Sequence, residues 1–107
     1  MTDRAPQDLI IGIDLGTTNS LVGVVDSGFP ILLANAEGHR LIPSVVHYPN
    51  EGAPLVGAAA SRMRAIAPGR TVASVKRLMG RRRDELAPEE TEDLGYQVVA
   101  APGGWAA

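Results

Sequence analysis

The chain has 107 residues, no cysteine and a formal net charge of -2 at pH 7. It is long enough for one domain at most, and it cannot form a disulfide framework or a thiolate metal site. The nearly balanced charge gives no general attraction to nucleic acid or to a membrane surface. Residues 1–8 are polar and lack the apolar core of a signal peptide, and no apolar run approaches the ~20 residues that span a bilayer. We therefore expect a cytoplasmic protein with no nucleic-acid or membrane partner.

Short strands separated by turns are predicted for the first half of the chain. Its apolar, β-branched runs predict strands over residues 9–14, 20–26, 31–34, 45–48 and 55–56. The first strand should be buried on both faces, because Leu9, Ile10, Ile11 and Ile13 are all apolar strand formers. His47 should be a half-exposed side chain of the fourth strand.

Helical segments are predicted for the second half, with a hairpin at the end. Residues 58–67 are rich in alanine and should be helical, with Pro68 ending the helix. A short helical stretch is predicted over 72–79, and an acidic helix capped by Asp84 over 85–93. A last strand over 96–100 should pair with one that begins at Trp105.

The turn after the first strand carries the residues best suited to chemistry. Gly16 permits a tight turn that comes close to a ligand, and Thr17, Thr18 and Asn19 add hydroxyls, an amide and main-chain N–H groups. Such a turn can hold a phosphate, and the carboxylate of Asp14 can hold a hydrated Mg²⁺ beside it. The alternative is an ordinary hairpin in which Asp14 caps its own turn. Turn chemistry alone leaves both interpretations open.

Lys76 is the second candidate, because it is the only lysine beside nine arginines. Lysine places a compact point charge on a flexible stem, whereas arginine is a wide planar fork. A site that positions one charge beside a phosphate and a water favours lysine. The alternative is an unremarkable surface lysine.

Charge is unevenly spread along the second half. Residues 62–83 contain eight basic and no acidic residues, and residues 84–93 contain six acidic and no basic ones. Either a basic face meets phosphates, or two solvated faces partly neutralise each other, and the second interpretation is favoured. A metal site at His39 and His47 is not expected, because no cysteine or carboxylate pair accompanies them.

Four segments in order resemble the heat-shock-protein-70 family of DnaK-like ATPases. IGIDLGTTNS (11–20) is similar to the first phosphate loop of that family, and NAEGHRLIPSVV (35–46), LVG (55–57) and VKRLMGRR (75–82) follow in the family's order. Together they span most of residues 9–83. The family is several times longer, so the chain resembles an N-terminal fragment.

The resemblance implies an α/β fold, a fragment of an actin-like (ribonuclease-H-like) ATPase domain with a mixed sheet and short helices. Residues 9–42 would begin the first subdomain, residues 43–107 would form a smaller upper subdomain, and the peptide-binding domain is absent. The implied cofactors are ATP and Mg²⁺. Asp14 would be catalytic and hold Mg²⁺ through water. Gly16, Thr17, Thr18 and Asn19 would bind the phosphates, and Lys76 would contact the γ-phosphate and orient the attacking water.

The resemblance implies that the full-length parent is an ATP-dependent chaperone that hydrolyses ATP. The 107-residue fragment alone is expected to be inactive. Its implied partners are a J-domain co-chaperone, a nucleotide-exchange factor and unfolded client polypeptide. The segments SVVHY (44–48) and SVKRLMGR (74–81) resemble most the family members specialised for iron–sulfur cluster assembly. The alternatives are an actin-like filament ATPase and a sugar or carboxylate kinase, which share the DxGTT turn but do not explain Lys76 in KRLMG after IPSVV. A stand-alone small α/β domain that keeps the loop is a further alternative.

Overall fold

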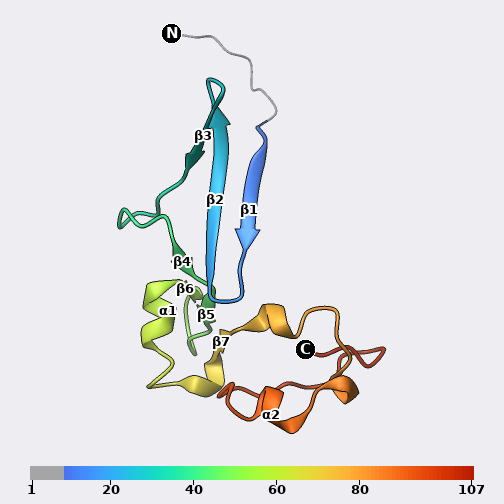
Figure 1. The fold of residues 1–107 in the computed structure, drawn as a ribbon. Coiled ribbons are helices and arrows are strands. Elements are labelled where there is room, and N and C mark those ends of the chain that lie inside the picture. The colour runs from blue at the N-terminus through green and yellow to red at the C-terminus, as the bar shows by residue number, and fades with distance from the viewer. Residues whose placement is uncertain (1–8) are drawn as a thin grey trace.

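The computed structural model describes residues 9–107. Residues 1–8, on which the prediction about a signal peptide rests, lie outside the described residues. The chain forms two small antiparallel sheets and then a segment of short helical turns (Figure 1). Its extents are 56 × 31 × 23 Å, and its radius of gyration of 17.5 Å exceeds the ~13 Å of a compact chain of this length. The two sheets therefore do not share one central core.

The first sheet is built around one long strand. β2 (Asn19–Asp26) pairs with β1 (Ile11–Leu15) on one side and with β3 (Phe29–Leu32) and β4 (Ile42–Pro43) on the other. The β2–β3 connection is Ser27–Gly28, and both residues have positive φ, 52° and 83°. Two such residues make the turn whose twist matches that of a hairpin. The predicted strands are confirmed here, with the third two residues earlier than expected.

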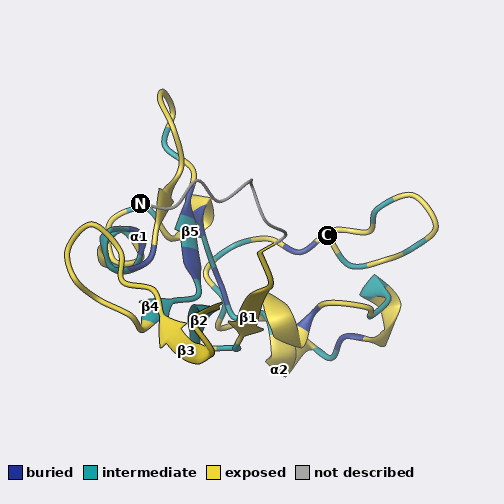
Figure 2. Ribbon diagram, turned by 90° about the horizontal axis from the view of Figure 1, so that it is seen from above, coloured by how far each residue is buried: buried dark blue, intermediate teal, exposed yellow. Residues whose placement is uncertain are grey.

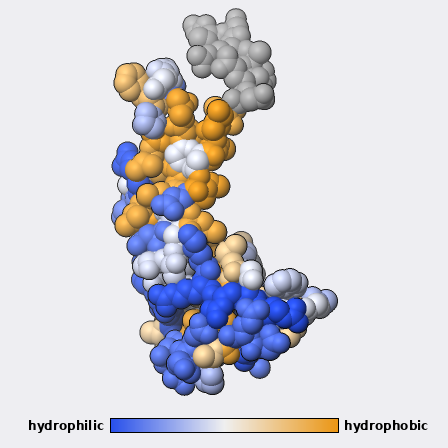
Figure 3. All heavy atoms as spheres, turned by 45° about the vertical axis from the view of Figure 1, so that its right-hand side comes forward, coloured by the Kyte–Doolittle hydropathy of each residue, from blue (hydrophilic) through white to orange (hydrophobic). Residues whose placement is uncertain are grey.

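The prediction that the first strand is buried on both faces is wrong for the described residues. Ile13 is 67% exposed, and every residue of β1 and β3 is exposed. Figure 3 shows hydrophobic side chains gathered over this sheet and hydrophilic ones over the opposite end of the molecule. An apolar pattern reports that a strand is suited to burial, but the covering layer must come from elsewhere, and residues 9–107 do not supply it.

The second sheet holds the first buried cluster. Its order is β6 (Leu55–Val56), β5 (Val45–His47) and β7 (Thr71–Ala73), and helix α1 (Ala58–Arg62) packs against it. Val45, Ala60 and Ala73 form the cluster, and Figure 2 shows β5 as largely buried. The prediction of a half-exposed His47 is wrong, because the side chain is 3% exposed and its Nδ1 lies 2.9 Å from the Thr71 hydroxyl oxygen.

Two predicted helices are wrong in extent or type. α1 ends at Arg62 rather than at residue 67, and turns follow it. The stretch predicted as a helix over 72–79 contains β7 and a 3₁₀ turn, Val75–Arg77. Thr71 and Val72 are β-branched and suit the strand that pairs with β5. Ser74 interrupts any helix because it adopts the left-handed conformation with φ 58°.

The acidic helix predicted over 85–93 is also wrong in extent. It is replaced by a 3₁₀ turn, Arg83–Glu85, and by α2 (Pro88–Thr91). Proline has no N–H and disfavours helical geometry in the residue before it, and Ala87 is extended with ψ 153°. Asp84 does not cap the helix. Instead, the carboxylate of Glu90 accepts a hydrogen bond from the Ala87 N–H at 2.8 Å.

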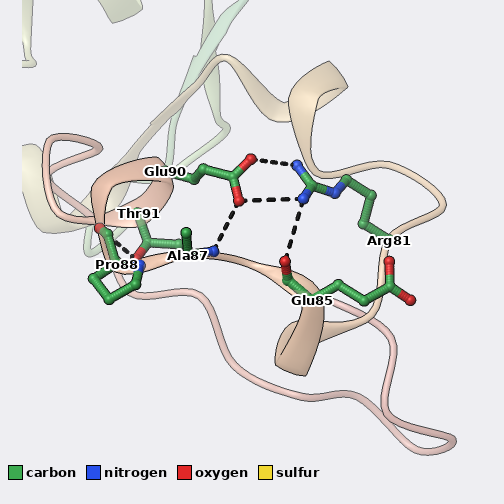
Figure 4. Close-up of polar contacts among 6 residues, drawn as sticks. All are labelled: Arg81, Glu85, Ala87, Pro88, Glu90 and Thr91. Carbon is green, nitrogen blue, oxygen red and sulfur yellow. Dashed lines mark hydrogen bonds and ion pairs between the residues drawn. The ribbon is translucent and has the colours of Figure 1, made fainter.

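Arg81 joins the basic stretch to the acidic one. Its guanidinium donates to both carboxylate oxygens of Glu90, at 2.7 and 3.2 Å (Figure 4). Hydrogen bonds from Arg81 and from the Ala87 N–H lower the pKa of Glu90 below its usual value, and the Glu90 contact raises the pKa of Arg81. A longer ion pair of 3.6 Å links Arg82 to Asp84. Mutual neutralisation, the favoured interpretation of the two charge runs, is thus seen at these pairs.

A second buried cluster lies in the C-terminal part. Leu78, Leu86 and Val98 form it, with Leu94, Tyr96 and Ala106 packed around them. The Tyr96 hydroxyl donates to the Ala73 carbonyl, and burial raises the pKa of its phenol. The predicted strand over 96–100 is not regular. Among the described residues, main-chain bonds join Val99 to Ala107 and the Ala101 N–H to the Trp105 carbonyl, and an isolated bridge pairs residues 100 and 106. Gly103 and Gly104, both with positive φ, lie in the turn between them. Among residues 9–107, no helix has the length and apolarity to cross a bilayer.

Candidate functional site

The candidate site is the turn Gly16–Thr18 between β1 and β2. The last paired residues before it are Asp14, opposite Leu21, and Leu15, opposite Ser20. Asp14 is exposed, and Gly16, Thr17 and Asn19 are half-buried. The hairpin therefore brings together all the residues predicted to bind phosphate and Mg²⁺, except Lys76. Asp14 is the single carboxylate of this group, and no cluster of three or more metal-ligating side chains occurs within residues 9–107.

The turn is too tight for a side chain at its first residue. A Cβ built on Gly16 would collide with the main-chain carbonyl oxygen of Asn19. The φ of Gly16 is not positive, so the requirement for glycine comes from space and not from backbone conformation. The missing Cβ leaves the backbone of the turn open to close approach by a ligand.

The main-chain N–H groups of the turn are available to an acceptor. Within residues 9–107, the N–H groups of Gly16, Thr17 and Thr18 donate to no main-chain or side-chain group. Consecutive free N–H groups in a turn form a concave surface that favours anions. The chemistry of this donor set fits a phosphate, and one exposed carboxylate beside it fits Mg²⁺ held through water and phosphate oxygens.

Ser44 contacts the turn and Ser20 contacts Ser44, and sequence reasoning did not single out either serine. The Ser44 hydroxyl donates to the Gly16 carbonyl at 2.8 Å, and the Ser44 N–H donates to the Thr18 carbonyl at 2.9 Å. The Ser20 and Ser44 hydroxyl oxygens lie 2.7 Å apart. The available signal was a serine between apolar strand residues in IPSVV, a segment already recognised for its resemblance. The structure thus joins this segment to the phosphate-loop segment.

Within the described residues, no hydrogen bond or ion pair joins Lys76 to the turn. It lies exposed in the 3₁₀ turn Val75–Arg77, after β7. Within residues 9–107 its ammonium makes no hydrogen bond or ion pair. The expectation that Lys76 and the Asp14–Asn19 turn face one cleft stays a prediction.

Two hollows lie near these residues, and neither resembles a closed nucleotide pocket. The first is a shallow groove over the exposed apolar face of β1–β3, and Asp14 is the one charged residue that lines it among residues 9–107. The second lies between β7 and α2. Arginines and carboxylates line it together, namely Arg64, Arg77, Arg81, Glu89, Glu90 and Asp93. The candidate turn is therefore one open wall of a site rather than a complete cavity.

Comparison with known proteins places the chain in a family of chaperones. Residues 10–107 match the family model described as Hsp70 protein. The chain belongs to the Hsp70 family. The ATPase domain of this family is actin-like, and the two small sheets with few short helices agree with a piece of it. The predictions of family and fold class are thereby confirmed.

Individual relatives agree with this assignment. The chain is 51% identical over 90 residues to the chaperone protein dnaK of Cyanophora paradoxa, an alignment covering 84% of the chain and 14% of the relative. It is 45% identical over 101 residues to the chaperone protein DnaK of Trichormus variabilis, covering 87% of the chain and 15% of the relative. The chain thus spans about one seventh of the length of these relatives.

Proposed function

We propose that this chain is the N-terminal part of the nucleotide-binding domain of an ATP-hydrolysing chaperone. Residues 9–42 would begin the first subdomain, and residues 43–107 would belong to the smaller upper one. The observation that carries the proposal is the geometry of the Gly16–Thr18 turn, which has no room for a Cβ at Gly16 and presents N–H groups that have no acceptor within residues 9–107. Membership of the Hsp70 family supports ATP as the source of the phosphates.

Each residue has a defined task in this proposal. The N–H groups of Gly16, Thr17 and Thr18, with the hydroxyls and the Asn19 amide, bind the phosphate oxygens. Asp14 holds Mg²⁺ through water, and the metal neutralises charge on the transferred phosphoryl group. Lys76 places one positive charge beside the terminal phosphate and orients the attacking water. A single preorganised charge of this kind is worth about 3 kcal/mol of the barrier.

The experiment compares two carboxylates on the same hairpin. In the full-length parent, Asp14→Asn should abolish most of the Mg²⁺ dependence of ATP affinity, measured by calorimetric titration with and without the metal. Asp26 lies at the far end of β2 and is equally exposed, so Asp26→Asn is the matched control and should behave as the unmodified protein. The same metal dependence in all three proteins would contradict the role of Asp14.

Partners and location follow from the same proposal. The parent would work in the cytoplasm with a J-domain co-chaperone, a nucleotide-exchange factor and unfolded client polypeptide. The segments SVVHY (44–48) and SVKRLMGR (74–81) support a narrower role in iron–sulfur cluster assembly. Pull-down of an iron–sulfur scaffold protein by the parent, weakened by ATP, tests that role, and equal capture of denatured model clients would favour general folding. A filament ATPase or a kinase is not favoured, because the comparisons identify an Hsp70-family chain.

A further inference from the structure

Ser44 contacts the candidate turn through both its side chain and its main chain. The hydroxyl donates to the Gly16 carbonyl, and the N–H donates to the Thr18 carbonyl two residues further on. These contacts bridge 28 residues of sequence, from the end of β1 to the segment between β4 and β5. One residue thus fixes two carbonyl groups that flank Thr17.

The direction of the second hydroxyl follows from the first. A serine hydroxyl has one proton and two acceptor lone pairs. Since the Ser44 proton is used on Gly16, the Ser44 oxygen accepts and the Ser20 hydroxyl donates, across 2.7 Å. Ser20 lies on β2, close after the turn, and Ser44 lies between β4 and β5. When the Ser44 oxygen accepts a hydrogen bond from Ser20, the Ser44 hydroxyl becomes a better donor to the Gly16 carbonyl.

The carbonyl contacts decide where the N–H groups point. No peptide bond in the described residues is cis, and in a planar trans peptide the C=O and the following N–H point in opposite directions. With the Gly16 carbonyl turned toward Ser44, the Thr17 N–H points away from it. The Thr18 carbonyl constrains the Asn19 N–H in the same way. The Ser44 contacts therefore hold the Thr17 N–H, one of the three proposed phosphate donors, pointing away from Ser44.

We propose that Ser44 is a positioning residue for phosphate binding and that Ser20 fixes the direction of its hydroxyl. This inference rests on the proposed function, because it needs a phosphate on the face of the turn that is directed away from Ser44. Neither serine touches the phosphate. Their role is to keep the turn in its binding conformation before the ligand arrives, which lowers the ordering cost of binding.

The test uses four variants of the full-length parent. Ser44→Ala removes the hydroxyl, Ser44→Thr keeps it, and Ser20→Ala removes only the donor to Ser44. Ser61→Ala is the matched control, because the Ser61 hydroxyl on α1 makes no hydrogen bond within residues 9–107. Two readouts are taken: amide hydrogen exchange at residue 44 without nucleotide, and the Kd of Mg·ATP by calorimetric titration.

Ser44→Ala should raise both the exchange rate and the Kd about three- to tenfold, the usual effect of one neutral hydrogen bond. Ser44→Thr should restore both, Ser20→Ala should show a smaller rise, and Ser61→Ala should show none. Equal exchange rates and Kd values in Ser44→Ala and Ser61→Ala would overturn the proposal. A Ser44→Thr variant with the same exchange rate and Kd as Ser44→Ala would also overturn it.

If Ser44→Ala does not fold, an unchanged exchange rate and Kd in Ser20→Ala overturn the proposal. A parent that binds no Mg·ATP refutes the proposed function, whereas a binding parent unaffected at Ser44 refutes only this inference.

Discussion

Replacing Gly16 by alanine gives a direct test of the turn geometry. The added Cβ would lie well inside the 3.0 Å that real Cβ atoms keep from their neighbours, and the atom in its way is the Asn19 main-chain oxygen. A backbone atom cannot swing aside as a side chain does, so the turn must open. Crowding of this kind costs about 1–3 kcal/mol, which corresponds to a rise of about 5- to 150-fold in Kd if the closed turn is the binding form.

Gly12 supplies the matched control for this change. It lies on β1 in the same hairpin, its φ is also not positive, and a Cβ there would meet nothing within 4 Å. Calorimetric titration of the full-length parent with Mg·ATP should therefore show weak binding in Gly16→Ala and nearly unchanged binding in Gly12→Ala. Equal affinities in the two variants would refute the argument that the tight turn is required for phosphate binding.

Three further predictions concern charge and completeness. Lys76→Arg should keep Mg·ATP binding but lose on the order of a hundredfold in single-turnover hydrolysis, whereas Arg77→Lys should keep both; equal rates would show that any cation suffices. The stability that Glu90 gains from Arg81 should be fully present above the usual carboxyl pKa of 4.5 and lost as the pH falls through its lowered pKa. Unfolding midpoints of Glu90→Gln and the unmodified protein should thus differ at neutral pH and converge in acid, with Glu89→Gln as control, and a gap independent of pH would contradict this assignment. The 107-residue chain alone should bind Mg·ATP no more tightly than about millimolar and release no phosphate, because it supplies one open wall of the site; a micromolar Kd would contradict that expectation.

Local chemistry explains what the sequence predicted well. The strands of the first half alternate with turn residues such as Ser27 and Gly28, and their pairing partners are close in sequence, so pattern and structure agree. The candidate phosphate-binding residues Asp14 to Asn19 were also predicted to surround one hairpin turn. A hairpin turn is specified by the residues inside it, so the sequence alone was enough to predict where this turn lies.

Contacts between distant residues explain what was missed. Thr71–Ala73 pairs with β5 about 26 residues earlier, and a short run such as TVA does not reveal that distant partner by itself. Whether β1 is buried or exposed depends on whether another layer packs on it. The contacts of Ser44 with the Gly16–Thr18 turn depend on the pairing of β4 with β2. None of these features leaves a periodic signal in the sequence. The charged pair Arg81–Glu90 was foreseen only as two runs of opposite sign.

The connection lengths of the first sheet have a consequence for the order of folding. β1, β2 and β3 are joined by turns of a few residues, so their hairpins can close within microseconds. The contacts of Ser44 with Gly16 and Thr18 require closure of a longer loop through residues 33–41, which costs more chain entropy. An isolated hairpin with both faces in water is marginally stable. The Gly16–Thr18 turn should therefore form early and transiently, and it should become persistent only when the segment carrying Ser44 docks beside it.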